Sequence, residues 1–152
     1  MTVSTDNPSV AFLEALAVDP VLIEELSGLS FSGTGTRRIC LHKSEASPLH
    51  VMLVESKPEQ VFPAHFHSDS DEVSVAVSGQ LEVVVWKDGH NMKPEKLILG
   101  GGQGDVPVSL IPKGVTHTTK AVGGNCIYLE VKLGPFSKDA LVEVSRSDLA
   151  SV

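Results

Sequence analysis

The chain has 152 residues and a formal net charge of −7, with 12 Lys and Arg against 19 Asp and Glu. This acidic balance argues against nucleic acids and anionic membranes as partners, because both attract basic protein surfaces. Hydrophobic residues make up 41% of the chain, which is enough for the core of one globular domain. Thirteen Gly and nine Pro indicate many turns, and therefore short strands rather than long helices.

The sequence also predicts a cytoplasmic protein. No stretch is apolar for long enough to span a bilayer, and the N-terminal residues lack the basic and apolar segments of a signal peptide. Cys40 and Cys126 have no CxxC spacing, and each lies in an apolar stretch. Both are therefore expected to be buried free thiols.

Residues 1–30 are predicted to form an N-terminal helical arm that does not fold independently. The apolar pattern of residues 9–17 suits a short amphipathic helix. Asp19 and Pro20 then supply an N-cap and a first helical residue for a second helix, which ends at Gly28. The apolar face of this arm is expected to pack on the main body or on a second subunit.

After the arm, the apolar period changes from helical to alternating, which predicts an all-β body over residues 31–136. A C-terminal tail of residues 137–152 follows, with a possible short strand at 140–144. Eight to ten short strands without an internal repeat are typical of one β-barrel or sandwich. The segments expected in the body are 38–42, 50–54, 61–67, 72–78, 81–87, 96–99, 108–111, 115–122 and 125–133.

Four residues are predicted to hold a metal. His65 and His67 lie in an extended segment, so both side chains point to the same face, and Glu72 follows just beyond a polar turn. His117, after a Pro-x-Gly turn, supplies a fourth ligand. Three imidazoles and one carboxylate suit a divalent first-row metal with open positions. Fe, Mn and Ni fit best, and Zn is also compatible.

These residues form two motifs that resemble those of the cupin superfamily. His65-x-His67-x4-Glu72-x6-Gly79 resembles the first cupin motif, and the segment 104–117, with Pro-x-Gly-x2-His at its end, resembles the second. The resemblance implies a cupin jelly roll, which is a double-stranded β-helix barrel. It also implies that one metal ion per chain lies inside the barrel, near one mouth.

A narrower resemblance covers about residues 37–136. The segments 38–42, 104–108, 111–118 and 130–136, together with the His-x-His-x4-Glu block, resemble WbuC-type cupin metalloproteins. That family is associated with bacterial surface-polysaccharide gene clusters. The resemblance therefore implies metal-dependent chemistry on a small polar molecule, such as a sugar derivative.

The leading hypothesis is an enzyme with oxygenase-, isomerase- or lyase-like chemistry on a small-molecule ligand. The alternative is a non-catalytic cupin that binds or senses a small molecule or a metal. The two differ in whether a titratable group lies within reach of an open coordination position. A homodimer is expected in either case, because the apolar arm and the edge strands need covering.

Three further residues are candidates for substrate contacts or proton transfer. Arg38 can hold a substrate carboxylate or phosphate if its strand faces a pocket; otherwise this face meets solvent or an interface. His42 lies on the same predicted strand face. Tyr128 can act as an acid or base near the metal, or it can pack at the barrel edge with its hydroxyl in water.

Overall fold

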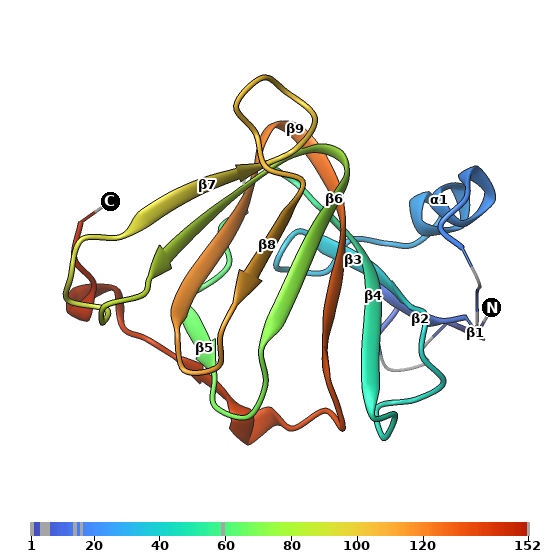
Figure 1. Cartoon of the computed structure of the whole chain (residues 1–152). Coiled ribbons are helices and arrows are strands. Elements are labelled where there is room, and N and C mark those ends of the chain that lie inside the picture. Colours follow the sequence, from blue (N-terminus) through green and yellow to red (C-terminus); the bar gives the residue numbers. More distant parts are fainter. Residues whose placement is uncertain (1, 4–6, 14, 16, 59, 152) are drawn as a thin grey trace.

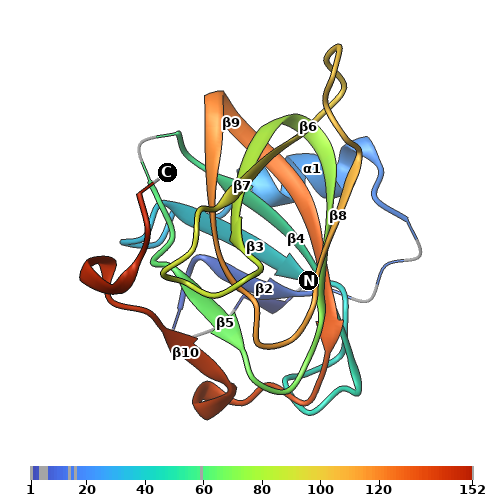
Figure 2. The same cartoon turned by 60° about the vertical axis from the view of Figure 1, so that its left-hand side comes forward.

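The computed structural model describes residues 2–3, 7–13, 15, 17–58 and 60–151. Its strands form one curved ten-stranded sheet that closes on itself as a jelly roll, and a short helix lies outside it (Figures 1 and 2). The strands are β1 (Thr2–Val3), β2 (Val10–Phe12), β3 (Thr36–Cys40), β4 (Leu49–Ser56), β5 (His65–His67), β6 (Glu72–Trp86), β7 (Glu95–Leu99), β8 (Val108–Ile111), β9 (Thr116–Leu133) and β10 (Leu141–Glu143). The predicted all-β jelly roll is confirmed.

Strand β9 lies at the centre of the sheet. Along one path the strand order is β1-β2-β3-β4-β9-β5-β10, and β6 also pairs with β7, β8 and β9. The C-terminal part of β9 pairs with β4, and its N-terminal part pairs with β5. Because β6 runs antiparallel to nearly all of β9, these two long strands connect the two sides of the barrel.

Two of the strand breaks predicted from the sequence are wrong. The segments predicted at 72–78 and 81–87 form one long strand, and so do those predicted at 115–122 and 125–133. Residues 72–86 form β6 without interruption, and residues 116–133 form β9. Gly79 has φ 76° and Gly123 has φ 73°. The register between β6 and β9 shifts on both sides of Ser78. The glycines therefore produce an irregularity at which both strands continue, instead of a turn that ends them.

The barrel interior is filled by apolar side chains from strands β3, β4, β6, β7, β8 and β9. The most deeply buried include Leu81, Val83, Leu99 and Cys126. Cys40 and Cys126 are buried free thiols, as predicted. Polar side chains replace apolar ones at one end of this interior, where the candidate site lies.

The second predicted helix is confirmed as α1 (Pro20–Ser27). Its N-cap is Asp19, whose Oδ1 accepts a hydrogen bond from the Leu22 backbone N–H at 2.9 Å. Leu22 and Leu26 pack against Ile39 and Leu53 on the outer face of β3 and β4. The helix is therefore attached to the barrel by its own small apolar core.

The prediction of a first helix over residues 9–17 is wrong. Residues Val10–Phe12 form β2, which pairs in parallel with residues 38–40 of β3. In so short a segment, the hydrogen bonds and apolar burial available at the edge of β3 override a weak helical pattern. Ala11, in the middle of β2, is completely buried against the α1 core. Residues 14 and 16 of the predicted helix lie outside the described residues.

The C-terminal segment lies along the barrel. The short strand predicted at 140–144 is confirmed as β10, which pairs antiparallel with β5. Further on, the Trp86 indole N–H donates to the Ala150 carbonyl at 3.2 Å. Within the described part of the chain, no helix has both the length and the apolar character needed to cross a membrane.

Candidate metal centre

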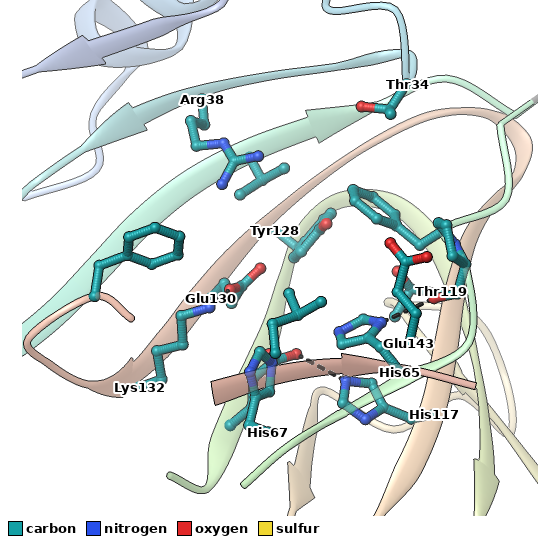
Figure 3. Close-up of a pocket in the computed structure, with 16 residues that line it drawn as sticks. Thr34, Arg38, His65, His67, His117, Thr119, Tyr128, Glu130, Lys132 and Glu143 are labelled. Atoms are coloured by element: carbon teal, nitrogen blue, oxygen red, sulfur yellow. Dashed lines mark hydrogen bonds and ion pairs between the residues drawn. The ribbon is translucent and has the colours of Figure 1, made fainter. Parts of the chain in front are cut away.

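A cavity of about 350 Å³ opens at one end of the barrel (Figure 3). Its wall combines aromatic and aliphatic side chains with an unusual number of charged and imidazole groups. It is lined by Thr34, Arg38, Val54, Phe62, Pro63, His65, His67, Glu72, His117, Thr119, Tyr128, Glu130, Lys132, Phe136, Leu141 and Glu143.

The four predicted metal ligands lie together in this cavity. His65 and His67 project from the same face of β5, and Glu72 is the first residue of β6. His117 comes from β9, where it is paired directly with His65. One donor atom from each of the four residues lies within 4.8 Å of the others. This group of donors has the composition and the spacing that a single metal ion requires.

Two of the imidazoles are oriented by backbone carbonyls. His65 Nδ1 lies 2.9 Å from the Pro63 oxygen, and His117 Nδ1 lies 3.1 Å from the Val115 oxygen. A carbonyl oxygen only accepts, so each Nδ1 carries the hydrogen and donates it. In a neutral ring this leaves the Nε2 lone pair free. The turns before β5 and β9 therefore select the tautomer that binds metal through Nε2.

Glu72 is the electrostatic centre of the cluster. Its carboxylate oxygens lie 2.8 Å from His67 Nε2 and 3.6 Å from His117 Nε2. Burial works to raise the pKa of Glu72, but the two imidazoles outweigh it and hold that pKa well below its usual range. Burial lowers the pKa of His117, and the Glu72 carboxylate raises it by more. Glu72 is therefore an ionised carboxylate.

His117 carries the strongest sign that something is to be bound here. Its side chain is 1% exposed. Its Nε2 atom is buried without a hydrogen-bond partner among the described residues. A buried polar atom without a partner costs about 1–3 kcal/mol. A metal ion accepting the Nε2 lone pair would remove this cost, so the residues present fit a metal.

Strand β9 supplies a second polar row to the cavity. Tyr128, Glu130 and Lys132 lie two residues apart along one face of the strand, and all three line the cavity. Lys132 Nζ lies 3.1 Å from Glu130 Oε1, so these two charges compensate each other. Tyr128 is almost completely buried, and burial raises its pKa well above its ordinary value. Its hydroxyl is therefore a neutral hydrogen-bond donor and acceptor.

The structure brings Arg38 into the cavity and leaves His42 outside its lining. Arg38 lies across the cavity from the imidazole cluster (Figure 3). The His42 ring stacks on His50, with ring centroids 4.0 Å apart, and its Nδ1 accepts from the Val51 N–H at 3.1 Å. His42 lies beyond the end of β3, where the alternation that would have placed it beside Arg38 no longer holds.

Glu143 is a cavity residue that the sequence analysis missed. It is opposite His65 in the pairing of β10 with β5, and Leu141 is opposite His67. These two side chains reach the cavity, whereas Val142 lies between them and is absent from its lining. Alternation along the predicted strand could have grouped Leu141 with Glu143. No local pattern in the sequence indicates that β10 pairs with β5.

Residues 35–98 match a protein family described as a domain of unknown function, DUF6016. No curated protein matches the chain. Many solved structures do. One is protein SO0799 from Shewanella oneidensis, with 14% identity and a TM-score of 0.64, over 86% of this chain and 87% of that protein.

Two further matches come from named proteins. KdgF from Halomonas sp. is 18% identical with a TM-score of 0.51, over 69% of this chain and 83% of that protein. Oxalate decarboxylase from Bacillus subtilis is 17% identical with a TM-score of 0.54, over 72% of this chain and only 27% of that protein. Identities this low establish the fold alone. The chain has the cupin jelly-roll fold.

Proposed function

We propose that this chain is a divalent-metal-binding cupin that carries out metal-dependent chemistry on a small polar molecule. The observation that supports this most strongly is the convergence of four donor atoms within 4.8 Å at a cavity in the barrel. One of them, His117 Nε2, is buried and has no hydrogen-bond partner in the described structure. A pocket with a few convergent polar groups is the usual form of a small-molecule site.

The residues that would hold the ion are His65, His67, Glu72 and His117. Three neutral nitrogens and one carboxylate, without thiolate, favour Fe, Mn or Ni and are compatible with Zn. When bound, a divalent ion supplies Lewis-acid chemistry to a substrate in the cavity. Burial of Glu72 and His117 keeps bulk water away from this part of the site.

The remaining cavity residues supply hydrogen-bond partners and apolar contacts for a substrate. The neutral hydroxyl of Tyr128 can donate a hydrogen bond to a substrate oxygen, and its raised pKa makes it a poor acid whose phenolate does not form near neutral pH. Phe62, Phe136 and Leu141 give the cavity apolar walls that limit water. The resemblance to WbuC-type cupins favours a sugar-derived substrate, and membership in that group stays a prediction.

Elemental analysis of purified protein tests the metal site. After reloading with Fe(II), Mn(II), Ni(II) or Zn(II), the wild type should carry a single divalent ion per chain. The double variant His65→Ala/His117→Ala should carry none. The control is His90→Ala, which removes an exposed imidazole outside the cavity. A wild type that stays metal-free after reloading would refute the proposal.

Catalysis is tested by incubating the metal-loaded protein with sugar acids, diketones and thiols while product formation and oxygen uptake are followed. Turnover that disappears in the double variant supports the enzyme. Saturable ligand binding without turnover of any compound would favour the non-catalytic alternative.

A further inference from the structure

We propose that the cavity takes a small hydroxycarboxylate, with its carboxylate bound by Arg38 and its hydroxyl groups facing Glu143 and the imidazole cluster. This inference deepens the proposed function, since it names the class of molecule that would lie beside the metal. It is based on which charges in the cavity have partners, on where the remaining charges lie, and on the space between them.

Most of the charged groups in the cavity are compensated. Glu130 pairs with Lys132 at 3.1 Å, and Glu72 is held by His67 at 2.8 Å. Among the described residues, the side chains of Arg38 and Glu143 make no hydrogen bond or ion pair. Glu143 is exposed and Arg38 is half-buried, so one cation at the wall and one anion at the rim are free to contact a ligand.

Arg38 is built into the cavity wall. It pairs across β3 and β4 with Val54, and both side chains line the cavity. The adjacent Arg37 lies on the opposite face of β3, where its Nε donates to Glu55 Oε2 at 2.7 Å. The Arg38 guanidinium is half-buried and points toward the centre of the cavity (Figure 3). Its planar array of donors matches the two oxygens of a carboxylate.

The surrounding charges favour a carboxylate over a phosphate. A phosphate group carries about −1.5 to −2 charges at neutral pH. Glu130 and Glu143 also line the cavity, and Lys132 is already engaged by Glu130. One guanidinium matches a single negative charge, and the described cavity lining offers no other unpaired Lys or Arg for the second charge of a phosphate held at Arg38. A carboxylate is therefore the better fit at Arg38.

The other end of the ligand needs neutral donors. Glu143 lies opposite His65 at the rim, and its carboxylate oxygens can accept hydrogen bonds. Hydroxyl groups would supply donors to it without adding charge. An ammonium group would bring another cation into a cavity that already holds Arg38 and the proposed divalent ion. Thr34, Thr119 and Tyr128 offer further hydroxyl partners around the same space.

The size of the cavity limits the ligand. Its volume of about 350 Å³ is near the lower end of the roughly 300–1,000 Å³ typical of ligand pockets. It accommodates a molecule the size of a monosaccharide acid. The β5–β10 pairing closes one side of the cavity.

Calorimetry with matched ligands tests this inference on the metal-loaded protein. The probes are glycerate and gluconate, their neutral amides glyceramide and gluconamide, and glycerol 1-phosphate. The wild type should bind at least one acid about tenfold or more tighter than the corresponding amide and tighter than the phosphate. If no acid is preferred over its amide, or if the phosphate binds best, the inference is wrong.

Variants locate the two ends of the ligand. Arg38→Gln should abolish the preference for acid over amide, and Arg38→Lys should retain part of it. The control Lys93→Gln should retain all of it, because Lys93 is an exposed cation outside the cavity. Glu143→Gln should lower the affinity for the acid that the wild type prefers. It should leave the affinity for propionate unchanged, because propionate has no hydroxyl group. An Arg38→Gln protein that still discriminates between acid and amide would overturn the assignment.

The metal content and circular dichroism of each variant separate this inference from the metal proposal. Arg38→Gln should fold and load metal like the wild type. If the wild type takes up no metal, the proposed function fails. The Arg38-dependent preference for acids, measured on metal-free protein, would then still support the carboxylate site, and its absence would refute that site too.

Discussion

His65 and His117 lie directly opposite each other on the antiparallel strands β5 and β9, with their ring centroids 4.5 Å apart. This is the only registered residue pair between these two strands in the described structure. Strand β5 is otherwise paired through β10, which comes from the C-terminal segment. The imidazole cluster is therefore located where few backbone contacts hold the strands together, and a metal shared by the two rings would link β5 to the centre of the sheet.

Metal binding should therefore stabilise the fold. A ligand that binds only the native state, at a free concentration of 100 times its Kd, adds about 2.7 kcal/mol to the free energy of unfolding. We expect the Tm of metal-free wild type to rise steadily as divalent ion is added. His65→Ala/His117→Ala should show no rise, and His90→Ala should behave like the wild type. An equal rise in the double variant would place the binding site elsewhere.

Arg37 and Arg38 are adjacent, and replacing them should have opposite consequences. Arg37 donates to Glu55 at 2.7 Å and to the Leu29 carbonyl at 2.8 Å, so it connects the segment after α1 to β4. The ion pair is largely buried, with side-chain exposures of 12% and 8%. Removing one member of a buried pair costs about 3 kcal/mol or more. Arg38 has no such partner among the described residues.

Urea denaturation distinguishes the two arginines. Arg37→Gln should lower the free energy of unfolding by about 3 kcal/mol, and Arg38→Gln should change it by less than about 0.5 kcal/mol. Conversely, Arg38→Gln alone should alter ligand binding under conditions in which both variants are folded. Comparable destabilisation by both substitutions would show that Arg38 has a structural role.

The ligand set could be predicted from the sequence because each half of it lies in a short motif. Strand alternation places His65 and His67 on one face, with Glu72 close behind. His117 lies fifty residues after His67, and the resemblance of its segment to the second cupin motif links it to the other three. The same alternation places Tyr128, Glu130 and Lys132 on one face of their strand. The structure brings all of these side chains to one cavity.

Features that depend on distant pairing could not be predicted. Whether residues 10–12 form a helix or a strand is decided by the free edge of β3, which lies far along the chain. Glu143 reaches the cavity only because β10 pairs with β5. The sequence predicts separate strands over 72–78 and 81–87, because a local pattern does not distinguish a turn at Gly79 from a bulge. In each case the deciding contact is tertiary.

Gly79 should be essential to the bend in β6. It has φ 76°, and a Cβ added there would lie 2.5 Å from the Asn125 carbonyl oxygen on the neighbouring strand. Gly79→Ala combines a left-handed backbone, which costs about 1–3 kcal/mol, with this steric clash. We expect a loss of at least about 2 kcal/mol in the free energy of unfolding.

The matched control for Gly79 is Gly101→Ala. Gly101 has nothing within 4 Å of an added Cβ, and its φ lies outside the left-handed range. Its substitution should change the free energy of unfolding by less than about 1 kcal/mol. If urea denaturation shows equal effects for the two variants, the bend at Gly79 does not require glycine.

The two cysteines should be unreactive in the folded protein until high pH. Burial is the largest influence on both thiols, and it raises the pKa of each from 9.0 to about 11. At mildly alkaline pH the folded protein should contain about a hundredfold less thiolate than the unfolded chain, and thiolate is the reactive form. A colorimetric thiol reagent should therefore label Cys40 and Cys126 slowly in buffer and rapidly in denaturant.

The same shifts predict how stability changes with pH. Between pH 9.0 and about 11 the unfolded chain loses its thiol protons and the folded chain keeps them. The unfolded state then binds fewer protons, so the free energy of unfolding falls as pH rises through this window. Below pH 9.0 both states are protonated, and the thiols contribute no slope. Rapid labelling of the native protein near pH 8 would contradict the prediction, since it requires a thiol that is exposed or has an ordinary pKa.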